Sequence, residues 1–194
     1  MPVVIKLGGS LAEADTVASW LSTVLAHGAG RAVIVPGGGY FANAVRAAQG
    51  RHRFSDQAAH RMAILAMEQY ARLLLDIAPA LVPGASLGAL HAALADDKVA
   101  LWLPSAMLES ECEIAQSWSV TSDSLAAWLA RRLEAERLVL VKSAPVPENA
   151  DPASLAELGL VDLAFPDYAA AARCPIACCG PGETERLAAL LALR

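Results

Sequence analysis

The chain is poor in charged residues, and this shortage excludes several classes of protein. Only 18% of its 194 residues are charged, whereas 56% are hydrophobic. This composition is typical of a folded domain with a large buried core and argues against disorder. The net charge is −5, so the chain lacks the basic surplus of a nucleic-acid-binding protein. Its densest basic cluster, Arg51-His52-Arg53, is too short for that role and suits a local anion site better.

The sequence also lacks the marks of a secreted or membrane-bound protein. Met1-Pro2 leads straight into an apolar strand pattern, so no signal peptide is expected. Residues 77–95 carry no charge, but prolines and glycines interrupt them and argue against a membrane-spanning helix. The four cysteines form no C-x-x-C pair. We therefore expect buried hydrophobes rather than metal ligands, in keeping with a reducing cytoplasm.

Hydrophobic periodicity predicts an α/β chain in which strands and helices alternate. Continuous apolar runs indicate buried strands over residues 3–7, 31–35, 99–103, 137–141 and 175–179. Amphipathic runs indicate helices over residues 11–26, 37–49, 56–77, 86–95, 121–135, 151–159, 167–172 and 181–193. Residues 109–118 are ambiguous, with a short strand or β-hairpin as one option. The order implies a mainly parallel sheet, so we expect a single domain over residues 1–194, built as a three-layer αβα sandwich.

Two glycine-rich stretches follow the first two strands. They are Lys6-Leu7-Gly8-Gly9-Ser10 and Pro36-Gly37-Gly38-Gly39. Glycine lets the backbone approach a ligand closely, and the exposed N–H groups at a helix start favour an anion. Two such junctions indicate two anionic groups held side by side, as a phosphoryl donor and its acceptor would be.

The position of Lys6 has two interpretations. A lysine at the carboxyl end of a buried strand points into the crevice where α/β proteins bind ligands. There it can neutralise charge on a transferring phosphoryl group. The alternative is a lysine that reaches water beside a tight turn, and the pentapeptide alone does not decide between them. The stretch is not a Walker A motif, because no G-K-[ST] follows the glycines.

The second stretch raises a rival function. Gly37, Gly39 and Ala42 match the dinucleotide fingerprint G-x-G-x-x-A, which suggests an NAD(P)-dependent oxidoreductase. That fingerprint expects another strand about twenty residues on, ending in an acid that holds the ribose. Here a helix runs into the basic cluster, and Asp56 belongs to the start of the next helix. The dinucleotide interpretation is therefore the weaker one.

A third motif, Thr121-Ser122-Asp123-Ser124, precedes an amphipathic helix. Helix capping by Thr121 or Ser122 is its ordinary explanation. The functional interpretation places Asp123 in the first helical turn, where its carboxylate would orient two lysines rather than act as a base. Lys142 is the second lysine, because it follows a buried strand just as Lys6 does.

These motifs, in this order, resemble the amino acid kinase superfamily over nearly the whole chain. Residues 54–70 and 117–124 are similar to its small, uridylate-kinase-like archaeal members. Those members phosphorylate aminomethylfuran-methyl phosphate to its diphosphate during methanofuran or methylofuran synthesis. The resemblance implies an ATP- and Mg²⁺-dependent kinase of a small phosphorylated metabolite, with no nucleic-acid or membrane partner. It also implies a homo-oligomer, for which residues 65–77 offer an apolar surface.

The resemblance assigns roles to individual residues. The catalytic residues would be Lys6, Asp123 and Lys142. The phosphate-binding residues would be Gly8, Gly9 and Ser10. The acceptor would be bound by Gly37, Gly38, Gly39, Asp56 and His60. The nucleotide would be bound by Thr121, Ser122, Lys142 and Asn149. No protein ligand for a metal is expected, since magnesium would be held mainly by the phosphates.

Some of these assignments leave alternatives open. Asp56 is equally explained as a helix cap or first-turn acid, and His60 as a structural residue. A phosphorylated acceptor would account for Arg51 and Arg53 near the acceptor loop, although an exposed loop without a ligand is the alternative.

The loop after the fifth strand departs from the family pattern. Relatives commonly continue into V-D-G, whereas this chain has residues 143–149, with two prolines and no aspartate. Either Glu148, Asn149 or Asp151 substitutes for the missing acid, or nucleotide binding is weakened. A catalytically inactive phosphate-binding module on the same fold is therefore a second alternative.

Overall fold

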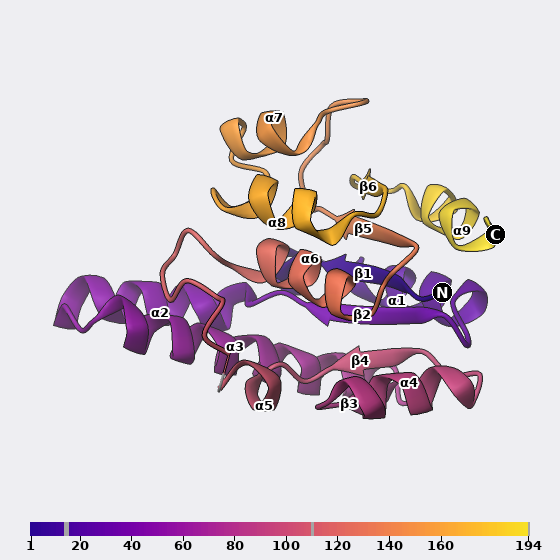
Figure 1. Ribbon diagram of the computed structural model, residues 1–194, viewed down its shortest axis with the longest axis horizontal. Coiled ribbons are helices and arrows are strands. Elements are labelled where there is room, and N and C mark those ends of the chain that lie inside the picture. The colour runs from indigo at the N-terminus through magenta and orange to yellow at the C-terminus, as the bar shows by residue number, and fades with distance from the viewer. Residues whose placement is uncertain (14–15, 110, 194) are drawn as a thin grey trace.

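Six parallel strands form one sheet in the computed structural model (Figure 1), which describes residues 1–13, 16–109 and 111–193. The strand order is β3-β4-β2-β1-β5-β6, and every neighbouring pair is parallel. The strands are β1 (Val3–Leu7), β2 (Ala32–Pro36), β3 (Val82–Gly84), β4 (Ala100–Trp102), β5 (Arg137–Val141) and β6 (Ile176–Cys179). The central strand β1 lies between β2 and β5, so loops from these three strands meet at one edge of the sheet.

Helices cover both faces of the sheet. In chain order they are η1 (Gly9–Glu13), α1 (Val17–His27), α2 (Gly39–His52), α3 (Asp56–Ile77), α4 (Leu87–Ala95), α5 (Ser105–Leu108), α6 (Ser122–Arg132), α7 (Pro152–Glu157), α8 (Phe165–Ala172) and α9 (Thr184–Ala192). Ile5 packs in one core with residues of α1, α3 and α9. Its neighbour Val4 packs in the other core with residues of α4, α6 and α8. Two cores on opposite faces confirm the expected three-layer αβα sandwich.

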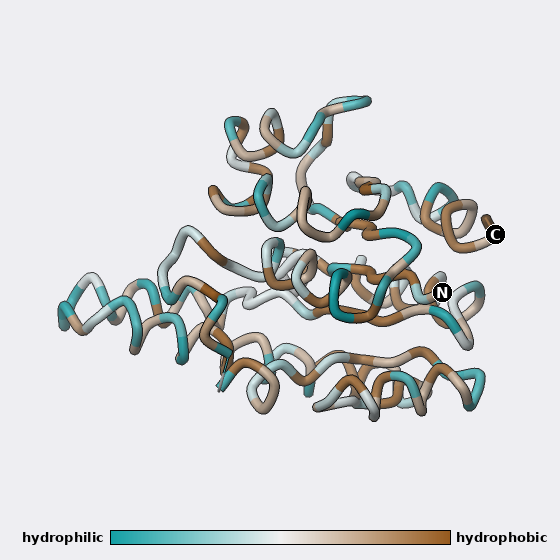
Figure 2. Tube along the Cα trace, in the orientation of Figure 1, coloured by the Kyte–Doolittle hydropathy of each residue, from teal (hydrophilic) through white to brown (hydrophobic). Residues whose placement is uncertain are grey.

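Hydrophobic residues concentrate in the sheet, as Figure 2 shows along β1, β2 and β5. All five residues of β1 are buried, as expected for a central parallel strand. By contrast, the end at which α2 meets α3 projects from the molecule and is largely hydrophilic. Residues 51–53 lie at this projecting end and are exposed.

Two segments differ from the sequence-based expectation. The short strand β3 was not expected, because Pro83 and Gly84 were taken as breaks. Proline is tolerated there because β3 is an edge strand with one neighbour, β4. Residues 109–118 were a possible strand or hairpin, but their described part, 109 and 111–118, follows α5 without forming either. The strand expected over 99–103 is shorter, Ala100–Trp102.

Several helix ends also differ from the expectation. The first helix does not begin at residue 11, because the 3-10 helix η1 precedes α1. α2 continues past Gly50 to His52, and its C-cap residue Arg53 adopts a left-handed conformation with φ 54°. α8 begins at Phe165, so Asp167 lies in its first turn and is not its cap. α9 begins at Thr184 rather than at 181. The start of α7 is confirmed, since Asp151 caps it and Pro152 follows.

Candidate active site

The site forms where β1, β5 and the start of α6 meet. Lys6 is the fourth residue of β1 and pairs with Leu140 of β5, so Lys142 follows two positions further on. Side chains alternate between the two faces of a strand, which places Lys6 on the same face as Val4, towards α6. Asp123 lies in the first turn of α6. The topology therefore brings Lys6 to Asp123 and Lys142, which both lie more than a hundred residues further along the chain.

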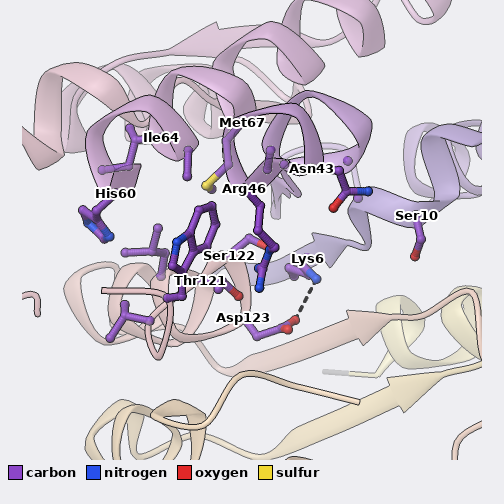
Figure 3. Close-up of a pocket in the computed structure, with 18 of the residues that line it drawn as sticks. Lys6, Ser10, Asn43, Arg46, His60, Ile64, Met67, Thr121, Ser122 and Asp123 are labelled. Atoms are coloured by element: carbon purple, nitrogen blue, oxygen red, sulfur yellow. Dashed lines mark ion pairs between the residues drawn. The ribbon is translucent and has the colours of Figure 1, made fainter. Parts of the chain in front are cut away.

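Lys6 and Lys142 bind the same oxygen of Asp123. The distance from Lys6 Nζ to Asp123 Oδ1 is 2.7 Å, and from Lys142 Nζ it is 2.6 Å. Figure 3 shows the Lys6–Asp123 pair at one side of the pocket. All three residues are buried, with 4%, 6% and 8% of the surface of Lys6, Asp123 and Lys142 exposed. Two ammonium groups and one carboxylate leave a net positive charge, which favours binding of an anion.

The electrostatics of this cluster keep its carboxylate ionised. Burial raises the pKa of Asp123, but the charges of Lys6 and Lys142 outweigh burial and hold that pKa below its usual value. Burial, together with the charge of Lys6, lowers the pKa of Lys142 to about 8. Asp123 is therefore an acceptor of two charged hydrogen bonds and is poorly suited to remove a proton from a substrate. The cluster is suited to neutralising charge on bound phosphates.

The two glycine-rich loops are packed backbone against backbone. A Cβ atom on Gly9 would lie 2.2 Å from the Gly39 nitrogen, and one on Gly37 would lie 2.3 Å from the Gly9 nitrogen. Gly8 is similarly close to β5, where its N–H donates to the Val141 carbonyl at 3.0 Å. These glycines thus allow three strand ends to converge as well as leaving backbone N–H groups near a ligand.

A pocket of about 230 Å³ lies beside the cluster, between α2, α3 and the segment that leads into α6. Lys6 and Asp123 line one side of it, and Figure 3 shows His60 on the opposite side. Ile64 and Met67 supply an apolar wall. Burial lowers the pKa of His60, although a hydrogen bond with the Ser117 backbone opposes this, so His60 is predominantly neutral at pH 7.

Arg46 and Trp118 also line the pocket, and the sequence analysis did not single out either as a site residue. The guanidinium carbon of Arg46 lies 4.2 Å from the centroid of the Trp118 ring, which is a cation–π contact. Trp118 Nε1 donates to Gln49 Oε1 at 2.6 Å, and Gln49 Nε2 donates to Asp56 Oδ1 at 2.8 Å. No short motif links these positions, because the Gln49–Trp118 contact spans 69 residues of the chain.

The structure brings most of the expected site residues to this pocket. Those that line it are Lys6, Gly9, Ser10, Gly38, Gly39, His60, Thr121, Ser122 and Asp123. Those that do not are Gly8, Gly37, Asp56, Lys142 and Asn149. Lys142 reaches the site through Asp123, whereas Asp56 reaches it only through Gln49 and Trp118. Arg51 and Arg53, expected near the acceptor loop, are exposed on the projecting end of α2, so Arg46 is the arginine in the pocket.

Asp162 caps the helix that carries Asp123, a contact that the sequence analysis missed. Its Oδ2 accepts from the Thr121 N–H at 2.9 Å and from the Thr121 hydroxyl at 2.8 Å. Asp162 also accepts from Ser124, through Oδ2 from its N–H and through Oδ1 from its hydroxyl. Thr121 occupies the N-cap position, but its own side chain accepts no capping hydrogen bond. The expected capping by Thr121 or Ser122 is thus replaced by a carboxylate from a distant loop.

The loop after β5 contains no residue that clearly replaces the missing aspartate. Asp151 accepts a capping hydrogen bond from the Ser154 N–H at 2.7 Å, so it is used by α7. Glu148 and Asn149 are exposed, and Asn149 has a positive φ of 58°. The start of this loop contacts the first glycine-rich stretch, because the hydroxyls of Ser10 and Ser143 are 2.6 Å apart.

Over residues 1–13, 16–109 and 111–193, no group of three or more His, Cys, Asp or Glu residues could hold a metal ion. The carboxylate in the pocket, Asp123, already binds two lysines. Among the described residues that line the pocket, no carboxylate is thus left free to bind a metal ion. Over the same ranges, no helix is long and apolar enough to cross a membrane.

Comparison with known proteins identifies the family. Residues 1–152 match the amino acid kinase family, which is most of the chain. The chain belongs to the amino acid kinase family. The lysine–aspartate–lysine cluster and both glycine-rich loops lie within the matched residues.

One relative and two solved structures are also similar to the chain. The chain is 30% identical over 138 residues to [5-(aminomethyl)furan-3-yl]methyl phosphate kinase of Methanocaldococcus jannaschii. That match covers 71% of this chain and 63% of the relative. The fold is similar to uridylate kinase from Archaeoglobus fulgidus, with a TM-score of 0.70, 17% identity and coverage of 98% and 95% of the two chains. UMP kinase from Bacillus anthracis gives a TM-score of 0.72 at 14% identity, with coverage of 97% and 93%.

Proposed function

We propose that this amino acid kinase family member transfers the γ-phosphoryl group of ATP to a small metabolite that already carries a phosphate. The acceptor we propose is [5-(aminomethyl)furan-3-yl]methyl phosphate, and the products are its diphosphate and ADP. The curated relative with 30% identity acts on this compound. The observation that carries the proposal is the binding of Lys6 and Lys142 to one oxygen of Asp123, because it concentrates positive charge where two phosphates must meet.

Each residue of the cluster has a distinct part in the proposed mechanism. Lys6, which lines the pocket, lies between donor and acceptor phosphates and offsets their repulsion. Lys142 contacts the donor from the β5 side. Asp123 holds both ammonium groups in place. Because phosphoryl transfer depends mainly on positioning and charge neutralisation, and a phosphate acceptor is already ionised, no protein base is needed.

The glycine loops and magnesium complete this site. We place the phosphate oxygens against the backbone of Gly9 and Gly39, which line the pocket. Magnesium would be held mainly by the phosphates rather than by side chains, and it would supply neutralisation of the charge that develops during transfer. The Ser10–Ser143 contact joins the phosphate loop to the loop after β5, where we place the nucleotide, near Asn149.

The test is an ADP-release assay with ATP, magnesium and [5-(aminomethyl)furan-3-yl]methyl phosphate, with the corresponding alcohol as the matched acceptor. We expect ADP release only with the phosphate ester, and a ³¹P spectrum of the product that shows a diphosphate. Lys6→Ala should abolish the release. If wild-type protein binds the phosphate ester but forms no ADP, the chain is a binding module and the proposed reaction is wrong.

We also propose self-association through α3, whose residues 65–77 were the expected apolar surface. Leu65 and Ile77 are 53% and 42% exposed, although both are hydrophobic. Burying them against a second copy would remove this apolar surface from water. Light scattering should give a dimer or larger species for the wild type and a smaller one for Leu65→Glu. A monomeric wild type would overturn this part of the proposal.

A further inference from the structure

We infer that Arg46 is the residue that binds the acceptor's phosphate group, and that Trp118 and Gln49 hold it in position. This inference rests on the proposed function, and it assigns the specificity for a phosphorylated acceptor to one side chain. Figure 3 shows Arg46 extending from α2 towards Lys6.

The positively charged guanidinium of Arg46 can bind an anionic ligand. Across the described parts of the chain, Arg46 forms no ion pair with Asp or Glu, unlike Arg31, Arg72, Arg132 and Arg186. Its contact is with the ring face of Trp118, which leaves the edge of the guanidinium available. That edge carries N–H donors in a planar fork that matches phosphate oxygens.

The composition of the pocket argues for a phosphate monoester at this position. Lys6 and Arg46 are the lysine and arginine that line it, and Lys6 is already paired with Asp123. A phosphate monoester carries nearly two negative charges at pH 7, so it needs a cation in addition to Lys6. The apolar wall formed by Ile64 and Met67 then remains for the uncharged ring of the acceptor.

A chain of contacts fixes the position of Arg46. The ring of Trp118 supports the guanidinium, and Gln49 fixes the ring by accepting from its Nε1 at 2.6 Å. Gln49 is fixed in turn by donating to Asp56 and to the Phe54 carbonyl. Asp56, expected to bind the acceptor, therefore acts as a positioning residue three contacts away from Arg46. Stacking on a fixed ring limits the freedom that a long arginine side chain would lose on binding a ligand.

Intrinsic fluorescence provides a binding test that does not depend on turnover. The chain has four tryptophans, and three of them, Trp20, Trp102 and Trp128, are buried in the cores. Trp118 is partly exposed in the pocket, so a ligand there should change mainly its emission. Trp118→Phe should remove the ligand-dependent change in emission, which would show that the change comes from Trp118. The ligands compared are [5-(aminomethyl)furan-3-yl]methyl phosphate and its alcohol.

The decisive variant is Arg46→Gln, and Arg51→Gln is its matched control on the exposed end of α2. Loss of charged hydrogen bonds should weaken binding of the phosphate ester by about 10- to 100-fold. Binding of the alcohol and the KM for ATP should not change, and Arg51→Gln should behave as wild type. If Arg46→Gln binds the phosphate ester as tightly as wild type does, the inference is wrong.

Gln49→Met tests the positioning role. This change keeps the side-chain length but removes the acceptor for Trp118 Nε1. We expect a higher KM for the acceptor with little change in kcat, and partial rescue by Gln49→Glu, which keeps an acceptor oxygen. In the Arg46→Gln background, Gln49→Met should have almost no further effect on the acceptor KM. Equal, additive effects in both backgrounds would overturn the positioning role.

The two proposals fail in distinguishable ways. If wild type binds the ester with a Trp118 signal that needs Arg46 but forms no ADP, the proposed reaction is wrong and the inference stands. If ADP forms and Arg46→Gln leaves the acceptor KM unchanged, the reaction stands and the inference is wrong. If the ester neither binds nor reacts, both are overturned.

Discussion

Gly9 and Gly37 touch through their backbones, at the point where the loops after β1 and β2 cross. A Cβ atom added to Gly37 would lie 2.3 Å from the Gly9 nitrogen and 2.6 Å from its Cα. Backbone atoms on both sides leave no flexible side chain to yield. The contact sets the spacing between the phosphate loop and the acceptor loop, so it links the geometry of the fold to that of the site.

Gly37→Ala should therefore damage both stability and activity. We expect unfolding free energy to fall by about 2 kcal/mol or more, as for other overpacked sites, and transfer activity to fall with it. Gly50→Ala is the matched control, because nothing lies within 4 Å of a Cβ at that position in α2. It should raise stability by about 0.5–1 kcal/mol. Urea unfolding measures the stability of both variants, and equal stability would contradict the prediction.

The pKa of Lys142 predicts how activity depends on pH. Burial and the charge of Lys6 lower that pKa to about 8. Lys142 is protonated below this pH and loses its charge as the pH rises through it. The value of kcat/KM for ATP, which reports the free enzyme, should thus be level below pH 8 and fall tenfold per unit well above it.

Lys142→Arg is the control for this pH profile. An arginine side chain keeps its charge throughout the range. The variant should be less active, because its guanidinium does not fit the ammonium position, but the alkaline fall should move to higher pH or disappear. A wild-type kcat/KM that stays level to pH 9.5 would show that Lys142 does not control nucleotide binding.

Substitutions of Asp123 and of Lys6 should have different effects on stability but the same effect on activity. Asp123→Asn leaves two buried ammonium groups without a counter-charge, so we expect a loss of about 3–5 kcal/mol, typical of a broken buried pair. Lys6→Met leaves one lysine and one carboxylate, a neutral pair, so stability should change by no more than about 1 kcal/mol or rise. Both variants should lose phosphoryl transfer. Denaturant unfolding measures the stability of both variants, and ADP release measures their activity. A strongly destabilised Lys6→Met would contradict this account.

The sequence could predict a mainly parallel sheet and five of the six described strands, because the central strands are buried on both faces. Short apolar runs rich in β-branched residues indicate such strands, and Lys6 and Lys142 lie together because β1 and β5 are neighbours in the sheet. The edge strand β3 was missed because edge positions tolerate Pro83. Proline normally argues against a strand, but β3 pairs on one side only, with β4, and so tolerates a residue without an N–H.

The rest of the site could not be predicted because its contacts join distant segments. Arg46 and Trp118 are ordinary residues of an amphipathic helix and a loop until tertiary packing stacks them. Asp162 lies 41 residues from Thr121, and Thr121 itself is a good capping residue by type. Local preference thus pointed to Thr121, whereas the folded chain supplies a carboxylate, which binds N–H groups and a positive helix end more strongly.

Asp162→Ala should reveal what this distant cap does for the reaction. It would leave the hydroxyls and N–H groups of Thr121 and Ser124 without their shared carboxylate, so we expect a loss of about 1–3 kcal/mol. Because the same turn carries Asp123, kcat should fall as well, by about 10-fold or more. Asp151→Ala is the matched control, since Asp151 caps α7 through Ser154. It should lose the stability that a helix cap contributes, with kcat unchanged. If the two variants lose activity only in proportion to stability, Asp162 is a cap and nothing more; a fall in kcat confined to Asp162→Ala would identify it as the residue that positions Asp123 between the two lysines.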